Sequence, residues 1–141
     1  MRTIPRRLRH MVEIIAGEKG KGKTKYLLDK VNTAIKYADG NLVYLDKSQK
    51  HMHELNNRVR LINVTDYPVT NCDEFLGFVC GIVSQDYDLQ EMYLDSFLTI
   101  ANISDEELIH AIEKLDVISE KFHVKFVLSV SRNEEIGRAH V

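Results

Sequence analysis

Apolar residues gather along the chain into two kinds of segment. Five short runs, rich in β-branched and aromatic residues and bounded by glycine or polar residues, predict buried strands. These runs cover residues 12–16, 42–45, 59–64, 90–97 and 125–130. Because strands that alternate with helices form parallel sheets, the pattern predicts an α/β fold, a mostly parallel sheet of about five strands with helices on both faces.

The segments between these runs carry apolar residues at helical spacing. Predicted helices cover residues 23–38, 48–57 and 74–84, and a longer helix opens at Ser104. In the second of them, Met52 and Leu55 are expected to face inward. Asp73 is the expected N-cap of the third, and Ser104 begins a capping box. The inward stripe expected for the last helix is Leu108, Ile109, Ile112, Leu115 and Ile118.

The length of 141 residues fits one domain, which we place at residues 11–134. Residues 1–10 are basic but contain no apolar stretch, so we expect a disordered basic leader rather than a secretory signal. The ending "EIGRAHV" resembles a translated sequencing adapter. We therefore expect residues 135–141 to be a non-native or disordered tail, and the domain to be truncated at its C-terminus.

Composition narrows the class of protein and its surroundings. Hydrophobic residues make up 44% of the chain and charged residues 28%, as in soluble globular domains. A net charge of −2 disfavours nucleic acid as a partner but does not exclude it. No apolar run has the length of a membrane span. Cys72 and Cys80 lie eight residues apart on one predicted helix, so we expect reduced, buried thiols and a cytoplasmic location.

The candidate chemistry begins at "GEKGKGKT", residues 17–24, which fits G-x-x-x-x-G-K-[ST] at every fixed position. A predicted strand precedes this segment and a helix follows it, which favours a phosphate site over a solvated Gly/Lys-rich turn. Lys23 is expected to reach the β- and γ-phosphates, and the Thr24 hydroxyl to bind Mg²⁺. The expected nucleotide-binding residues are Gly17, Glu18, Lys19, Gly20, Lys21, Gly22, Lys23, Thr24 and Lys25.

A magnesium site of this kind needs a carboxylate at the end of a neighbouring strand. Asp95 in "EMYLDSF" and Asp46 in "LVYLD" have similar surroundings in the sequence. Asp95 is the favoured metal ligand because its strand comes later, after two further strand–helix units. Helix capping is the alternative role for either residue.

The order of these segments resembles that of the RecA-like branch of P-loop NTPases, and the chain is similar to short bacterial ATP-binding proteins. The likeness runs from Ile14 to Val130 and rests on the glycine-rich segment followed by "YLD", "RLINV", "DEFLGFVCGIVSQ" and "YLDS". It implies the strand order 59–64, 42–45, 90–97, 125–130 and 12–16. It also implies a further strand beside residues 12–16, whose absence from this sequence agrees with truncation.

The chain departs from the RecA-like pattern at the positions where that family carries glutamates that activate water. RecA-like ATPases carry a glutamate just after the second strand, where this chain has Asp46-Lys47-Ser48, and many relatives carry one where Ser96 stands. Asp46 is the candidate substitute for that glutamate as a water-orienting carboxylate, so Lys23 and Asp46 are the candidate catalytic residues. The resemblance suggests Ser129 and Ser131 as sensors of the γ-phosphate, with simple strand-end polarity as the alternative.

These expectations lead to one main function and two alternatives. The main one is Mg²⁺-dependent binding of ATP, with hydrolysis that is slow or depends on a partner, so the expected cofactors are ATP and Mg²⁺. The partner would be a second copy of the chain or another protein. The alternatives are a nucleoside or nucleotide kinase, although no arginine-rich lid is evident, and a non-catalytic nucleotide-binding adaptor.

Overall fold

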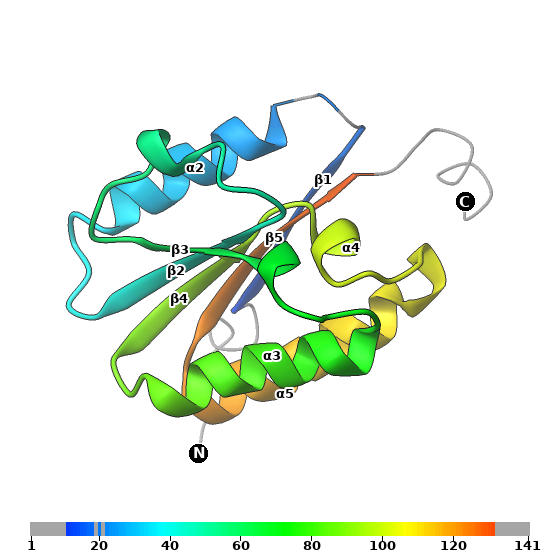
Figure 1. The fold of residues 1–141 in the computed structure, drawn as a ribbon. Helices are drawn as coiled ribbons and strands as arrows, with labels where there is room; N and C mark the ends of the chain where they lie inside the picture. The colour runs from blue at the N-terminus through cyan, green and yellow to red at the C-terminus, as the bar shows by residue number, and fades with distance from the viewer. Residues whose placement is uncertain (1–10, 19, 21, 132–141) are drawn as a thin grey trace, which may run out of the picture.

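Five parallel strands form one sheet in the computed structural model, which describes residues 11–18, 20 and 22–131 (Figure 1). The expected leader (1–10) and tail (135–141) lie outside the described residues, as do Lys19 and Lys21. The strands are β1 (Val12–Gly17), β2 (Asn41–Asp46), β3 (Arg60–Asn63), β4 (Leu89–Leu94) and β5 (Lys125–Ser131).

The strands lie in the order β1-β5-β4-β2-β3 across the sheet. This is the order that the resemblance implied, and it confirms the expected five-stranded α/β fold. Because every strand runs in the same direction, all five carboxyl ends meet at one edge of the sheet. Among the described strands β1 has a single neighbour, β5, whose residues pair with it in continuous register from Val12 to Gly17.

One face of the sheet is covered by helix α2 (Lys23–Ala34). Its buried side chains recur at helical spacing and pack against alternate residues of the strands, because side chains along a strand point to opposite faces. The contact joins Leu27, Leu28, Val31 and Ile35 with Leu42, Tyr44, Tyr93 and Val127. The helix therefore lies over β5, β4 and β2, and its first turn follows β1 in the chain after residues 18–22.

The opposite face is covered by α3 (Cys72–Gln85) and α5 (Leu108–Phe122), so helices do lie on both faces as predicted (Figure 1). A short helix, α4 (Phe97–Ile100), follows β4 and packs into the same core. The other set of alternate strand residues, including Val43, Leu45, Met92, Leu94, Phe126 and Leu128, forms that core.

The prediction of a helix over residues 48–57 is wrong. The segment forms turns around a three-residue 3₁₀ helix (Met52–Glu54), and Met52 is 48% exposed. The Asn32 side chain in α2 explains the difference: its amide donates to the Glu54 carbonyl at 2.8 Å and its oxygen accepts from the Asn56 N–H at 2.8 Å. These bonds occupy backbone groups that a helix would pair internally. Leu55 is partly buried against the α2 core, so its inward placement holds.

Several boundaries also differ from the predictions. The first helix ends at Ala34 instead of residue 38, and the next residues form a tighter turn through bonds such as Tyr37 N–H to the Ala34 carbonyl. Strand β4 ends at Leu94 instead of residue 97, because Ser96 takes a left-handed conformation. Residues 105–107 form a 3₁₀ turn before α5, inside the predicted capping box of Ser104 and Glu107, which is present.

Three residue-level expectations need correction. The N-cap of α3 is Asn71, whose side chain accepts from the Glu74 N–H at 2.9 Å, and Asp73 lies in the first turn. Cys72 is buried but Cys80 is exposed, and both are free thiols on one helix. Ile109 is 65% exposed and lies off the buried stripe of α5.

Within the described part of the chain, no helix is long and apolar enough to cross a membrane.

Gly40, in the turn before β2, gives a test of the packing that holds β2 against β4. A Cβ atom at this position would lie 2.2 Å from the Asp88 carbonyl oxygen, which accepts the Asn41 N–H across the turn. We expect Gly40→Ala to lower the free energy of unfolding by about 1–3 kcal/mol, as measured by urea denaturation.

Gly77→Ala is the matched control, because Gly77 lies in α3 with no atom near the position of a new Cβ. This change should leave stability unchanged or raise it by up to about 1 kcal/mol through helix propensity. Equal effects of the two substitutions would contradict the tight approach at Gly40.

Candidate functional site

A cleft of about 540 Å³ opens at the carboxyl edge of the sheet. It lies where β1, β5, β4 and β2 end, which is the edge at which ligands bind in open α/β sheets. Its lining comes from the start of α2, the residues after β2 and β4, helix α4 and the end of β5. The lining residues are Gly20, Gly22, Lys23, Thr24, Lys47, Asp95, Ser96, Leu98, Thr99, Ser129 and Ser131.

The first turn of α2 faces this cleft. Among the described residues, no capping side chain forms a hydrogen bond with the backbone N–H groups of this turn. It also lacks acidic residues and carries Lys23 and Lys25. The start of α3 is the opposite case, with a capping side chain and two acidic residues in its first turn. Because a helix N-terminus bears partial positive charge, lysines there are unfavourable unless an anion binds. The start of α2 is therefore suited to an anionic ligand.

Two glycines shape the loop that leads into α2. Gly20 and Gly22 both have φ of 80°, a conformation that costs most other residues about 1–2 kcal/mol. Gly22 is the N-cap residue, and its carbonyl accepts the Tyr26 N–H at 3.1 Å. The two glycines thus turn the chain toward the helix, and neither of them places a side chain between the helix N-terminus and the cleft.

Asp95 ties three elements together at the cleft. Its carboxylate accepts hydrogen bonds from Thr24 Oγ1 in α2 at 3.2 Å, from Tyr44 OH in β2 at 2.9 Å and from Ser129 Oγ in β5 at 2.8 Å. The side chain is only 2% exposed. Burial, together with the charge of Asp95, raises the pKa of Tyr44, so this phenol stays a donor. A buried carboxylate is thereby fixed within reach of the Thr24 hydroxyl.

The tripeptide Tyr-Leu-Asp occurs twice, and the two copies lie side by side. Tyr44 pairs with Tyr93 and Leu45 with Leu94 in the β2–β4 ladder, and the Asp95 N–H donates to the Leu45 carbonyl at 3.0 Å. Asp46 and Asp95 therefore end neighbouring strands on the same face of the sheet. Their environments differ because β4 lies one strand nearer to β1, so Asp95 receives the Thr24 hydroxyl.

Asp46 is as buried as Asp95 but much less well paired. Its Oδ1 accepts the Lys47 N–H at 2.7 Å, whereas its Oδ2 is buried with no hydrogen-bond partner among the described residues. Burial raises the pKa of the Asp46 carboxyl above its ordinary value, and the charge of Asp95 raises it further. The Lys47 N–H and the positive charges of His51 and Lys47 oppose this rise.

Ser96, directly after Asp95, adopts the left-handed conformation with φ of 56° and ψ of 55°. This backbone is costly for a serine and is held by the Ser96 N–H, which donates to Ser129 Oγ at 2.7 Å. The Ser129 hydroxyl donates in turn to Asp95, so one side chain fixes both residues. The turn makes room for Ser96 on the cleft wall and sends the chain into α4.

The structure brings most of the predicted site together. Gly20, Gly22, Lys23, Thr24, Asp95, Ser129 and Ser131 all line the cleft. Gly17 ends β1 below it, and the Glu18 carbonyl accepts a hydrogen bond from Lys23 Nζ.

Two further predicted residues also lie apart from the cleft lining. Lys25 is exposed and pairs with Asp29 at 3.1 Å on the outer surface of α2. Asp46 lies beneath the cleft rather than on its wall.

Thr24 and Asp95 fit a magnesium ion by the chemistry of their donor atoms. A hydroxyl and a carboxylate oxygen 3.2 Å apart are hard ligands of the type that Mg²⁺ prefers. Among the described residues no group of three or more His, Cys, Asp or Glu side chains could hold a metal. An ion that keeps several waters and is shared with substrate phosphates needs no such cluster.

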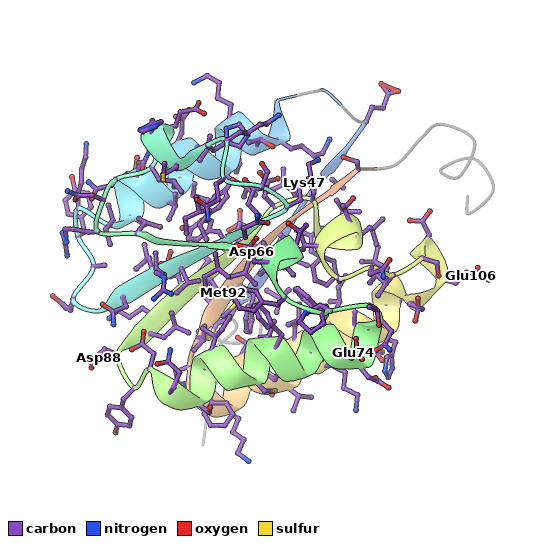
Figure 2. All side chains as sticks on the ribbon, in the orientation of Figure 1. Lys47, Asp66, Glu74, Asp88, Met92 and Glu106 are labelled. Carbon is purple, nitrogen blue, oxygen red and sulfur yellow. The ribbon has the colours of Figure 1, made fainter. Side chains whose placement is uncertain are left out.

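A second cleft, of about 590 Å³, lies between α3 and the amino-terminal part of the β2–β3 edge. Its polar side chains are largely engaged with each other or with the backbone: Asn41 donates to Asp86 at 3.0 Å, and Arg58 donates to the Ile35 carbonyl at 3.1 Å. Asp88, near the start of β4, marks this amino-terminal edge in Figure 2, far from Lys47 at the carboxyl edge. The engaged groups make this cleft the weaker candidate.

Sequence reasoning missed Tyr44 and Lys47. Tyr44 lies two residues before Asp46 on the same strand, so alternation alone places it on the face that carries the aspartates. Lys47 lines the cleft in the position where the resemblance led us to look for a glutamate. Leu98 and Thr99 were also missed, because a strand was expected to continue through residue 97.

Neither family models nor curated proteins identify the chain: the sequence matches none of the family models searched, and no curated protein is significantly similar to it. We therefore infer the function of the protein from the geometry of the carboxyl-edge cleft.

The pKa of Asp46 leads to a prediction about stability and pH. Because the pKa of Asp46 is raised in the folded protein, its carboxyl group stays protonated at pH values where the same group in the unfolded chain has lost its proton. The wild-type protein therefore loses stability relative to Asp46→Asn as the pH rises above about 4. We expect the variant's advantage in free energy of unfolding to grow by at most about 1.4 kcal/mol per pH unit, until the raised pKa is passed. Urea denaturation across this pH range measures the difference.

Asp39→Asn controls for the loss of one negative charge, because Asp39 is exposed in the turn after α2. A difference between Asp46→Asn and wild type that stays constant, or shrinks, with rising pH would contradict the assignment.

Proposed function

We propose that this protein binds ATP together with Mg²⁺ in the carboxyl-edge cleft and hydrolyses it slowly or only with a partner. The observation that carries the proposal is the hydrogen bond between Thr24 at the start of α2 and the buried Asp95 at the end of β4. It joins an anion-binding helix terminus to a metal-binding carboxylate, the two parts that a Mg²⁺–triphosphate complex requires.

Each part of the cleft then has a role in binding. The amides of the glycine-rich loop and of the first turn of α2 hold the phosphate chain, and Lys23 contributes positive charge. Thr24 and Asp95 hold the magnesium ion, which neutralises the phosphate oxygens. The strand order supports this reading, since β5 separates β1 from β4 as the resemblance to RecA-like P-loop NTPases implied.

Binding has more support than hydrolysis. Ser96 occupies the position after the metal aspartate and cannot act as a carboxylate base. Asp46 holds the Lys47 N–H and lies beneath the cleft, which argues against direct contact with a water at the phosphate. Slow turnover follows from this arrangement, unless a partner supplies the missing group.

The presence of Ser96 in place of a carboxylate base also favours a second candidate function. This candidate is a non-catalytic adaptor, in which bound nucleotide stabilises a surface for another protein. Turnover distinguishes the two candidates. Phosphate release above the buffer background by the protein, abolished by Asp95→Asn, would favour the ATPase; binding without release, alone or with partners, would favour the adaptor.

The role of Lys23 can be tested by titration calorimetry with ATP and Mg²⁺. We expect Lys23→Ala to weaken ATP binding by about 10- to 100-fold, the usual contribution of a charge-assisted hydrogen bond. Lys36→Ala, an exposed lysine after α2, controls for net charge and should bind as wild type does. Unchanged affinity of Lys23→Ala would refute the site.

The role of Asp95 is tested by the dependence of binding on magnesium. Asparagine keeps an acceptor oxygen for Thr24 or Ser129, but it loses the charge that attracts the cation. We expect the ratio of ATP affinities with and without Mg²⁺ to fall toward one in Asp95→Asn. Circular dichroism checks the fold, and a variant that keeps the wild-type ratio would show that the ion binds elsewhere.

A further inference from the structure

Lys47 is the second lysine among the described residues of the cleft lining and comes from a different element than Lys23. Lys23 follows β1 and Lys47 follows β2, and the sheet places β5 and β4 between these strands. Three strand spacings of about 4.8 Å put the ends of β1 and β2 roughly 14 Å apart. The two side chains therefore enter the cleft from opposite sides, with Asp95 and Ser129 between them; Figure 2 labels Lys47 between α2 and α4.

The backbone N–H of Lys47 is paired with a buried carboxylate, whereas its ammonium group makes one long contact among the described residues. The Lys47 N–H donates to the buried Asp46 Oδ1 at 2.7 Å, which sets the direction of the turn after β2. Its Nζ makes a long contact of 3.4 Å to Ser96 Oγ, and it forms no ion pair with any described carboxylate. A weak contact of this length is readily exchanged for a stronger acceptor.

The charges of the cleft indicate what that acceptor is. The described charged residues of the lining are Lys23, Lys47 and Asp95, and a magnesium ion at Asp95 would add further positive charge. A phosphate chain bound at the first turn of α2 can extend across the ends of β5 and β4 toward β2. Its far end then meets Lys47, whose ammonium group offers three donors to phosphate oxygens.

We propose that Lys47 binds the terminal phosphate of a bound nucleoside triphosphate and makes the site prefer triphosphates to diphosphates. This inference rests on the proposed function and specifies which form of nucleotide the site selects. Asp46 is then a positioning residue that acts through the Lys47 backbone, which gives its buried carboxyl a role without contact to the ligand. Ser96 holds the ammonium group when no phosphate is present.

The test compares ATP and ADP binding, each with Mg²⁺, by titration calorimetry of wild type and Lys47→Met. Methionine keeps an unbranched side chain of similar length and removes the charge. We expect ATP affinity to fall about 10- to 100-fold and ADP affinity to change by less than about threefold, so that the ratio of the two affinities collapses. Lys47→Arg retains a cationic donor and should keep most of the preference.

Lys50→Met is the matched control, because Lys50 is exposed, lies three residues away and is absent from the cleft lining. It should leave both affinities unchanged. A wild-type ATP-to-ADP ratio in Lys47→Met, or an equal loss for both nucleotides, would overturn the inference and leave the binding site intact. Failure of wild type to bind either nucleotide would instead remove the proposed function and this inference together.

Discussion

The candidate site depends on the way in which one buried carboxylate is held. Asp95 receives hydroxyl donors from α2, β2 and β5, which are far apart in the sequence and meet only because parallel strands end at one edge. Ser129 extends this arrangement by accepting the N–H of Ser96, which stabilises a left-handed residue directly after the aspartate. The fold and the chemistry of the cleft are therefore linked at a single side chain.

Around this carboxylate the sequence departs from the choices that would most stabilise the fold. The first turn of α2 carries lysines where the helix dipole favours acidic residues, Ser96 adopts a conformation better suited to glycine, and Asp46 leaves a buried oxygen without a described partner. The start of α3 and the 3₁₀ turn that leads into α5 have acidic residues or capping side chains. Departures from local preference that gather at one edge are typical of binding sites.

Much of this arrangement could be predicted from the sequence, since apolar runs located the five strands and the glycine-rich segment marked the start of α2. The choice of Asp95 over Asp46 could be made only from strand order, because the two Tyr-Leu-Asp tripeptides are locally alike. Residues 48–57 were mispredicted because bonds from Asn32, more than twenty residues away, decide their structure. Lys47 was missed because its place on the cleft wall depends on the packing of β2 against β4.

Binding of a nucleotide at the first turn of α2, beside Asp95, is the proposal on which the roles of Lys23, Thr24 and Lys47 depend. Backbone amide chemical shifts of the ¹⁵N-labelled protein, followed during a titration with Mg²⁺ and ATP, test it most directly. Binding at this site should produce the largest changes at Gly22, Lys23, Thr24 and Ser96, with little change beside Arg58 and Arg60 in the second cleft. Changes centred on the second cleft, or none at the start of α2, would contradict it.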